Sequence, residues 1–149
     1  MGGVSAPLKA ARVLLVDDHP ALLQQARRLL DAEFDIVGTL SDGTDLAETV
    51  ARQHPDIVVL DITLPGANGI ELAAQLKAAG GPARIVFLTV HCDTDYLRAG
   101  FAAGASGYVV KSRMVTDLVP ALHEVLRGGN YVSACPELET DLRPIIPLP

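Results

Sequence analysis

Short apolar runs alternate along the chain with longer stretches in which apolar residues recur at helical spacing. The runs that read as strands are residues 12–16, 34–40, 56–60, 84–89 and 107–110. Each is followed by a stretch that reads as an amphipathic helix, and the last of these ends at Gly128-Gly129. Nearly unbroken apolar strands separated by amphipathic helices are typical of a parallel sheet covered on both faces. The pattern therefore predicts an α/β fold with a five-stranded parallel sheet and helices on both faces.

The pattern changes after about residue 130. The remaining residues show no sustained period and contain Pro136, Pro144, Pro147 and Pro149. We interpret residues 10–130 as one domain and residues 131–149 as a tail or linker remnant that is partly disordered. A chain of 149 residues is long enough for one domain with a full core and short for two.

Composition and charge exclude several classes of function. The net charge of −6 and the predicted pI of about 5.0 argue against direct binding to nucleic acid, which needs clustered Lys and Arg. No apolar run approaches the roughly 18 residues of a membrane span, and the N-terminus lacks the pattern of a signal peptide. Cys92 and Cys135 show no metal-ligand spacing and are expected to be free thiols. We therefore expect a cytoplasmic protein with no membrane association.

Polar residues stand at the ends of four of the predicted strands. They are Asp17-Asp18, Asp61, Thr89 and Lys111. Right-handed crossovers place the carboxyl ends of parallel strands at one edge of the sheet, so these side chains are expected to meet in space. Taken singly, each has an ordinary explanation: a strand-ending turn, a residue with high β-propensity, or a solvated charge. The joint pattern predicts a site.

The chemistry of this set indicates phosphoryl transfer. Three neighbouring carboxylates are unfavourable unless one is protonated or a cation lies among them. Mg²⁺ prefers oxygen ligands and pairs readily with phosphate oxygens. A carboxylate such as Asp61 can attack a phosphoryl group and form an acyl phosphate, while Lys111 and Thr89 offer a positive charge and a hydrogen bond to the phosphoryl oxygens. The residues therefore predict magnesium-dependent phosphorylation of Asp61.

The same residues resemble those of a known family, the response regulator receiver domain of two-component signalling. The resemblance covers about residues 10–130, and the motifs that match in order are Asp17-Asp18, residues 61–69, Thr89 and residues 104–111. Further segments resemble the receivers that usually precede a helix-turn-helix in LuxR/NarL/FixJ-type regulators, namely residues 17–20, His91 and residues 127–131. Any one of these pieces is weak evidence, but the combination is specific.

The resemblance implies a flavodoxin-like (CheY-like) (βα)5 fold and a phosphoacceptor signalling domain. Such a domain is not an enzyme in the usual sense, because it catalyses only its own phosphotransfer and dephosphorylation. The resemblance also implies that Asp61 accepts a phosphoryl group from a sensor histidine kinase or a phosphotransfer protein. The other implied roles are Mg²⁺ ligation by Asp17, Asp18, Asp61 and the backbone carbonyl of Thr63, phosphoryl contacts by Lys111 and Thr89, and an output switch formed by Thr89 and Tyr108.

The output of this switch is expected at the fourth helix. Gly100, inside that predicted helix, costs about 1 kcal/mol relative to alanine. We interpret the helix as a weakly held element that responds to phosphorylation. The resemblance implies that the signal reaches the face formed by the fourth helix, the fifth strand and the fifth helix, where a downstream protein would bind.

Several alternatives stay open at this point. The chain is expected to be a receiver that signals through protein contacts, with no direct nucleic acid partner; the alternative is the receiver fragment of a LuxR-type DNA-binding regulator whose helix-turn-helix is absent. Apolar surface on the first and fifth helices that the core does not use could form the interface of a homodimer. A phosphohydrolase of the haloacid dehalogenase type would need a second acid where Thr63 stands. A receiver-like module that signals without phosphate is disfavoured by the intact set of acids, hydroxyl and lysine.

Overall fold

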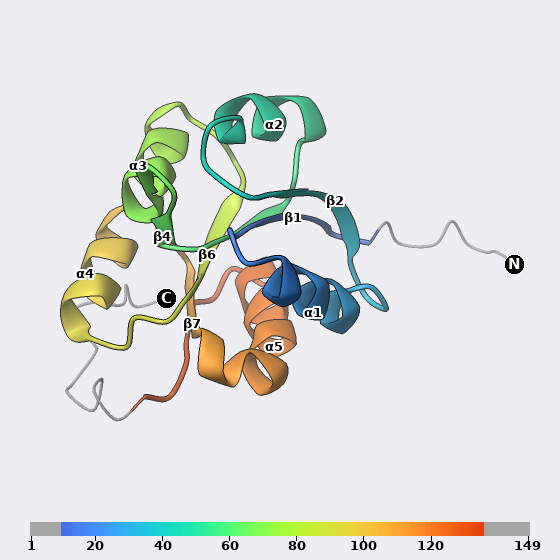
Figure 1. Cartoon of the computed structure of the whole chain (residues 1–149), viewed down its shortest axis with the longest axis vertical. Helices are drawn as coiled ribbons and strands as arrows, with labels where there is room; N and C mark the ends of the chain where they lie inside the picture. The colour runs from blue at the N-terminus through green and yellow to red at the C-terminus, as the bar shows by residue number, and fades with distance from the viewer. Residues whose placement is uncertain (1–9, 136–149) are drawn as a thin grey trace, which may run out of the picture.

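The computed structural model describes residues 10–135, and its centre is a six-stranded parallel sheet (Figure 1). The strands, in the order in which they lie across the sheet, are β2 (Asp35–Leu40), β1 (Arg12–Val16), β3 (Ile57–Leu60), β6 (Arg84–Thr89), β7 (Gly107–Val110) and β8 (Tyr131–Val132). The helices are α1 (Pro20–Leu30), α2 (Leu46–Gln53), α3 (Gly69–Ala78), α4 (Thr94–Ala102) and α5 (Met114–Leu126). The predicted α/β fold with a flavodoxin-like strand order is confirmed.

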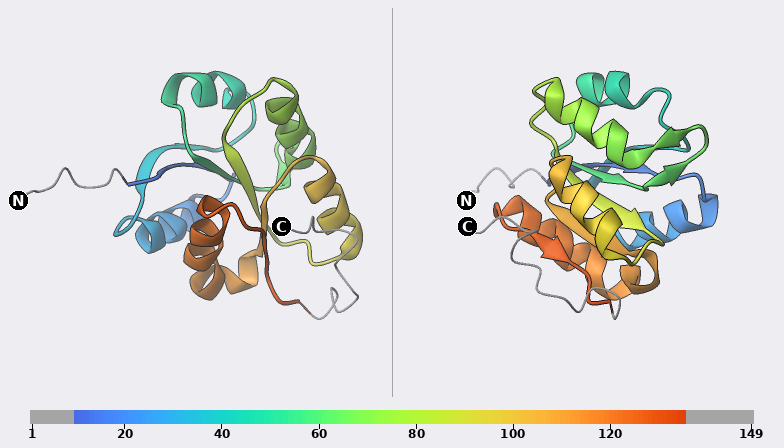
Figure 2. Two further views of the ribbon diagram at one scale, coloured as in Figure 1. Left: turned by 180° about the vertical axis from the view of Figure 1, so that it is seen from behind. Right: turned by 90° about the vertical axis from the view of Figure 1, so that its left-hand side faces the viewer.

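Two features of the sheet were not predicted. A short antiparallel pair, β4 (Thr63–Leu64) and β5 (Ala67–Asn68), shapes the loop between β3 and α3. The sixth strand, β8, extends the sheet beside β7, and this edge is visible in Figure 2. No helix among residues 10–135 is long and apolar enough to cross a bilayer.

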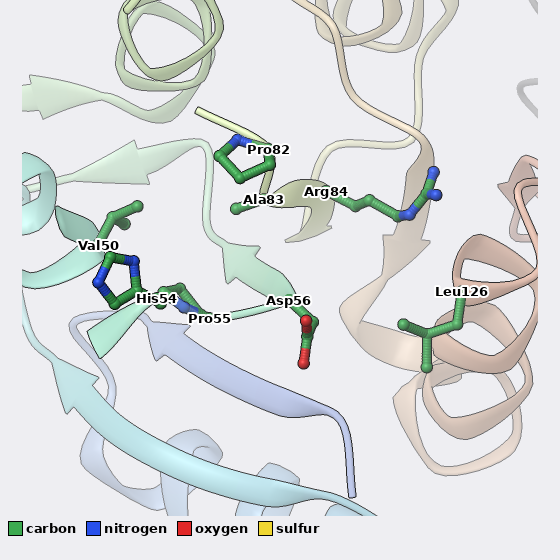
Figure 3. Close-up of a pocket in the computed structure, with 8 residues that line it drawn as sticks. All are labelled: Val50, His54, Pro55, Asp56, Pro82, Ala83, Arg84 and Leu126. Atoms are coloured by element: carbon green, nitrogen blue, oxygen red, sulfur yellow. The ribbon is translucent and has the colours of Figure 1, made fainter. Parts of the chain in front are cut away.

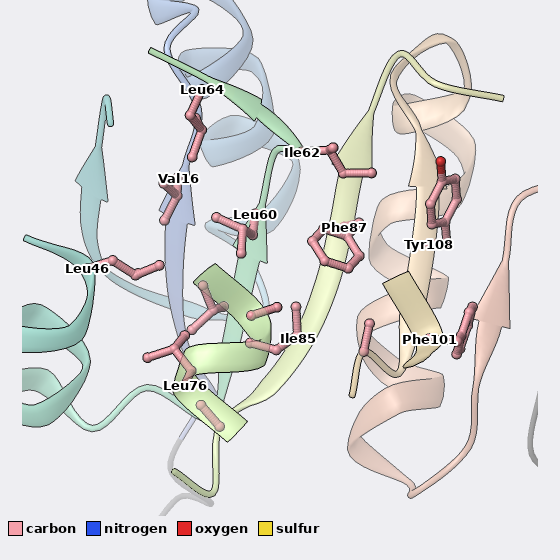
Figure 4. Close-up of a cluster of buried hydrophobic side chains, with 14 of the residues drawn as sticks. Val16, Leu46, Leu60, Ile62, Leu64, Leu76, Ile85, Phe87, Phe101 and Tyr108 are labelled. Atoms are coloured by element: carbon pink, nitrogen blue, oxygen red, sulfur yellow. The ribbon is translucent and has the colours of Figure 1, made fainter. Parts of the chain in front are cut away.

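The two faces of the sheet carry separate aliphatic cores. One face packs on α1 and α5, through residues such as Leu30 and Leu118. The other packs on α2, α3 and α4, and Figure 4 shows its central side chains, among them Leu60, Phe87 and Tyr108. β1, β3, β6 and β7 are almost wholly buried, because helices cover both faces. This burial fixes the strand ends on which the polar residues stand.

The helix starts follow from local sequence. Pro20 occupies the first turn of α1, where no backbone donor is needed. Asn68 caps α3, since its Oδ1 accepts a hydrogen bond of 2.8 Å from the backbone amide of Ile70. Asp93 caps α4 in the same way, through the amide of Tyr96 at 3.0 Å. These caps set where each helix begins after the functional loops.

Residues 131–135 pack against the domain. The amide of Ser133 donates to the carbonyl of Tyr108 at 2.9 Å, which continues the pairing of β8 with β7. The Ser133 hydroxyl donates to Asp117 Oδ2 at 2.7 Å and accepts from the Val110 amide at 3.2 Å. The predicted boundary at residue 130 falls just before β8, and the interpretation of residues 131–149 as a linker stays a prediction. The partial disorder predicted for residues 131–149 is not tested, because residues 136–149 lie outside the described residues.

The prediction of free thiols is wrong. Cys92, in the loop between β6 and α4, forms a disulfide with Cys135. The two Cα atoms lie 6.4 Å apart, which suits a disulfide. The pairing depends on β8, because only the return of the chain along β7 brings Cys135 to this loop. Spacing along the sequence carries no sign of that return.

Gly69 is required where α3 starts against the end of β3. A methyl group at this position would collide with the backbone carbonyl of Asp61 and lie 2.9 Å from the Cα of Ile62. We expect Gly69→Ala to lower the free energy of unfolding by about 1–3 kcal/mol, because neither backbone can yield easily. The measurement is urea unfolding followed by circular dichroism.

Gly38→Ala is the matched control. Its added methyl group would lie 3.3 Å from Leu14 Cδ1, the end of a side chain that can move, so the loss should be smaller. Equal losses in the two variants would contradict the close backbone approach at Gly69.

Candidate functional site

The carboxyl ends of β1, β3 and β7 bring three charged side chains together. Asp17 follows β1 and Asp61 follows β3, and these strands pair in register from Val13 with Ile57 to Val16 with Leu60. Strand order reverses at this pair, and open α/β sheets form their sites in the crevice at such a point. Lys111, which follows β7, reaches the same crevice. The predicted convergence is therefore present in the structure.

The ammonium of Lys111 bridges the two buried carboxylates. Its Nζ donates to Asp61 Oδ2 at 2.8 Å. It also lies 2.9 Å from Asp17 Oδ2, although this second contact is an ion pair without hydrogen-bond geometry. The side chains of Asp17 and Asp61 are each 3% exposed and that of Lys111 is 10% exposed. Such burial makes the bridge necessary, because an unpaired charge here would be strongly unfavourable.

The acids of the site hold oxygens that suit a cation. Asp17 Oδ2 and Asp18 Oδ1 are buried and accept no hydrogen bond within residues 10–135. Asp17, Asp18, His19 and Asp61 each offer one ligand atom, and these atoms all lie within 4.8 Å of one another. Carboxylate oxygens are the ligands that Mg²⁺ takes. The residues present therefore fit a magnesium ion, although His19, a nitrogen donor, is an ordinary ligand for softer metals.

Burial and neighbouring charges shift the pKa values of Asp61 and Lys111. Burial raises the pKa of the Asp61 carboxyl above its ordinary value of 3.8, and the charge of Asp17 acts in the same direction, while the hydrogen bond from Lys111 opposes both. Burial disfavours the charge of Lys111, but its interactions with Asp61 and Asp17 outweigh this and raise its pKa above 10.5. The lysine is thus firmly charged, whereas negative charge at Asp61 is costly and would be relieved by a cation.

A chain of hydrogen bonds leads from the acids to the loop before α4. The amide of Thr63 donates to Asp61 Oδ1 over 3.4 Å, and the Thr63 hydroxyl lies 2.9 Å from His91 Nε2. The amide of His91 donates to the hydroxyl of buried Thr89 at 3.2 Å. The hydroxyl of Tyr108, whose ring is fully buried, donates to the His91 carbonyl at 2.8 Å. His91 therefore connects Thr63, Thr89 and Tyr108.

The structure distributes the predicted site residues over two neighbouring groups. Asp17, Asp18, Asp61 and Lys111 meet directly, as the strand ends predict. Thr63, Thr89 and Tyr108 instead meet around His91. No contact tests the Thr63 carbonyl as a metal ligand, so that role stays a prediction.

His19 and His91 were not among the predicted site residues, and both contact the site. His19 is the N-cap residue of α1, and its Nδ1 lies 2.9 Å from Asp17 Oδ1 and 3.2 Å from Asp18 Oδ1. The ring of His91 stacks on Tyr96, with the ring centroids 3.9 Å apart. The adjacency of His19 to the acidic pair is visible in the sequence, whereas the partners of His91 come from β4, β6, α4 and β7.

A cavity of about 490 Å³ lies at the opposite end of the sheet (Figure 3). Residues 54–56, which precede β3, form one wall, and residues 82–84, which lead into β6, form another. The cavity is therefore at the amino ends of the strands. It does not belong to the acidic site, which lies at the carboxyl ends.

Comparisons with known proteins agree with this geometry. The family model described as the response regulator receiver domain matches residues 13–123. The chain is 30% identical to the transcriptional regulatory protein DegU of Brevibacillus brevis, over 81% of this chain and 52% of DegU. It is 34% identical to the nitrate/nitrite response regulator protein NarL of Escherichia coli K12, over 89% of this chain and 63% of NarL. The chain thus spans about half the length of DegU.

A solved structure shows the same fold at higher identity. It is the crystal structure of a two-component response regulator of the LuxR family from Aurantimonas sp. SI85-9A1. It is 36% identical, covers 87% of this chain and 93% of its own, and superposes with a TM-score of 0.80.

The raised pKa of Asp61 predicts a pH-dependent effect of its removal. The folded state holds this proton more tightly than the unfolded chain, so the contribution of Asp61 to stability falls as pH rises above 3.8. Asn at this position cannot ionise. Relative to the wild type, Asp61→Asn should therefore gain stability as pH rises above 3.8, as measured by urea unfolding.

Asp117→Asn is the contrasting variant, because the pKa of Asp117 is lowered where that of Asp61 is raised. Burial favours the neutral form of Asp117, but hydrogen bonds from Ser133, Arg113 and Thr116 outweigh it and lower its pKa. The stabilisation by Asp117 is present above pH 3.8 and is lost as pH falls through the lowered value. Relative to the wild type, this variant should be destabilised by a constant amount above pH 3.8, and the loss should shrink as pH falls below that value. A shift of both variants in one direction would contradict the assignment.

Proposed function

The chain belongs to the response regulator receiver domain family, and we propose that it is a phosphorylation switch whose acceptor is Asp61. The observation that carries this proposal is the buried bridge in which Lys111 pairs with Asp61 and Asp17, beside carboxylate oxygens of Asp17 and Asp18 that accept no hydrogen bond within residues 10–135. One carboxylate in this arrangement is available to a phosphoryl group, a lysine neutralises the added charge, and further acids remain for a cation.

The chemistry follows from the positions of these groups. A carboxylate oxygen of Asp61 attacks the phosphorus of the donor, the bond from phosphorus to the donor's leaving group breaks, and an acyl phosphate forms. Bound Mg²⁺ would supply charge neutralisation and in-line orientation of the phosphoryl oxygens. Asp17, Asp18 and Asp61 would hold it, with the Thr63 carbonyl as a further ligand. Lys111 stays charged throughout and would move from the carboxylate toward the phosphoryl oxygens.

Thr89 and Tyr108 are the proposed output switch. Thr89 would turn its hydroxyl toward the phosphoryl group, and this hydroxyl now accepts a bond from the His91 amide. Tyr108 is buried between the sheet and α4, packed edge-on against Phe87. Because His91 bonds to both residues, a movement of Thr89 would be transmitted to Tyr108 and to the start of α4.

Receiver domains of two-component systems interact with kinases or phosphotransfer proteins. For this chain we propose a sensor histidine kinase or a phosphotransfer protein as the donor, and a protein that contacts the α4–β7–α5 face as the output partner. Self-catalysed dephosphorylation, a homodimer and a cytoplasmic location remain part of this proposal. DegU and NarL are described as regulators, so output through DNA stays an alternative for any protein of which this chain is a part.

Incubation with a small phosphodonor and Mg²⁺ tests the proposal directly. Intact-mass measurement of the wild type should show the addition of one phosphoryl group, and chelation of the metal should abolish the addition. Asp61→Asn should show none, because an amide cannot form the acyl phosphate.

Asp35→Asn serves as the control, since Asp35 is exposed and pairs with Arg12 far from the site. It should be labelled as fully as the wild type. A wild type that stays unlabelled would instead favour signalling without phosphate, and steady release of phosphate from an ester substrate would favour a phosphohydrolase.

A further inference from the structure

The disulfide Cys92–Cys135 joins the loop beside the site to the segment after β8. Cys92 directly follows His91, whose ring and backbone contact Thr63, Thr89 and Tyr108. Cys135 lies two residues beyond Ser133, which is buried against α5 and β7. The bond therefore connects two segments that both carry contacts to the functional groups.

Tyr108 holds both of these segments by separate atoms. Its side-chain hydroxyl donates to the His91 carbonyl at 2.8 Å, and its backbone carbonyl accepts from the Ser133 amide at 2.9 Å. The disulfide closes this arrangement into a ring of contacts. Cleaving the disulfide would remove the covalent link between the two segments and leave the His91 loop held by hydrogen bonds and by its stacking on Tyr96.

A cavity gives access to the disulfide from outside. It has a volume of about 550 Å³ and is lined by both cysteines together with Val90, Val110, Ser112, Arg113 and Ala134. Val90 is 65% exposed and the Arg113 side chain is 46% exposed, so the cavity meets solvent. The cavity therefore gives an attacking thiolate a route to the two sulfurs, on which exchange depends.

We propose that Cys92–Cys135 is a thiol–disulfide exchange site whose oxidised form fixes the loop beside the acidic site and whose reduction by a dithiol releases it. A thiolate of the dithiol attacks one sulfur of the bond, and the other cysteine leaves as a thiolate and takes up a proton. The second thiol of the dithiol then attacks the mixed disulfide and frees the remaining cysteine. The protein disulfide gains two electrons and two protons, and the dithiol is oxidised to a disulfide.

Release of the loop would change the lifetime of a phosphoryl group on Asp61, and this part rests on the proposed function. The ring of His91 lies 2.9 Å from the Thr63 hydroxyl, so the loop borders the entrance to the acids. A fixed loop restricts the access of water to the site, whereas a released loop admits it. The oxidised protein should therefore keep its phosphoryl group longer, by about threefold to tenfold.

Hydrogen exchange measured by mass spectrometry tests the release of the loop without any phosphate. The full chain has two cysteines, so thiol titration should find none free after oxidation and two after treatment with dithiothreitol. Peptides that cover residues 89–93 and 131–135 should exchange about tenfold faster in the reduced protein. Cys92→Ser and Cys135→Ser should show the fast exchange under both conditions, while a peptide from β1 should not change.

Each outcome has a defined meaning. Two free thiols after oxidation, or equal exchange in the two redox states, would overturn the proposal whether or not Asp61 is phosphorylated. Faster exchange with an unchanged phosphoryl lifetime would overturn the regulatory role of the bond. A failure of Asp61 to accept phosphate counts against the proposed function alone, because the exchange measurement does not involve it.

Discussion

The charge of Lys111 is the constraint on which the site depends. The carboxylates of Asp17 and Asp61, each 3% exposed, lie at the ends of adjacent strands. Their repulsion must be compensated in a buried crevice. The ammonium compensates part of it, and the oxygens of Asp17 and Asp18 that accept no hydrogen bond are ligands through which a cation could compensate the rest. A phosphoryl group on Asp61 would change this balance of charge, because it adds negative charge to the carboxylate that Lys111 already contacts. The same imbalance would make the site responsive to phosphate, and it lowers stability when no cation balances the carboxylates.

His91 connects the acidic site to the neighbouring strands. It bonds to Thr63 at the edge of the site, to Thr89 at the end of β6 and to Tyr108 in β7. The backbone carbonyl of Tyr108 in turn accepts a hydrogen bond from the amide of Ser133, in the segment that contains Cys135. The loop before α4 is thus the common neighbour of the proposed phosphate switch and the proposed redox site. Phosphorylation of Asp61 and reduction of the disulfide would both act on this loop.

The sequence predicts the sheet and the acidic site well, because both follow from short-range pattern. Asp17, Asp61 and Lys111 meet because each directly follows a buried parallel strand, a relation that hydrophobic periodicity reveals. Strand β8 and the disulfide were missed, since residues 131–135 have no sustained period and pair only through tertiary contacts. Gly100 shows a second limit: it reads as a weak point in a helix, yet an added methyl group would lie 3.0 Å from Phe87 Cε2. Its absence of a side chain allows α4 to pack closely on the sheet, which periodicity cannot show.

The identity of the phosphorylated atom is the most direct test of the account. After treatment with a phosphodonor and Mg²⁺, borohydride reduces an aspartyl phosphate to homoserine, which peptide mass spectrometry can locate. The account predicts homoserine at position 61 and unmodified aspartate at positions 17 and 18. Homoserine at either of those positions, or no homoserine in a protein that has gained a phosphoryl group, would contradict it.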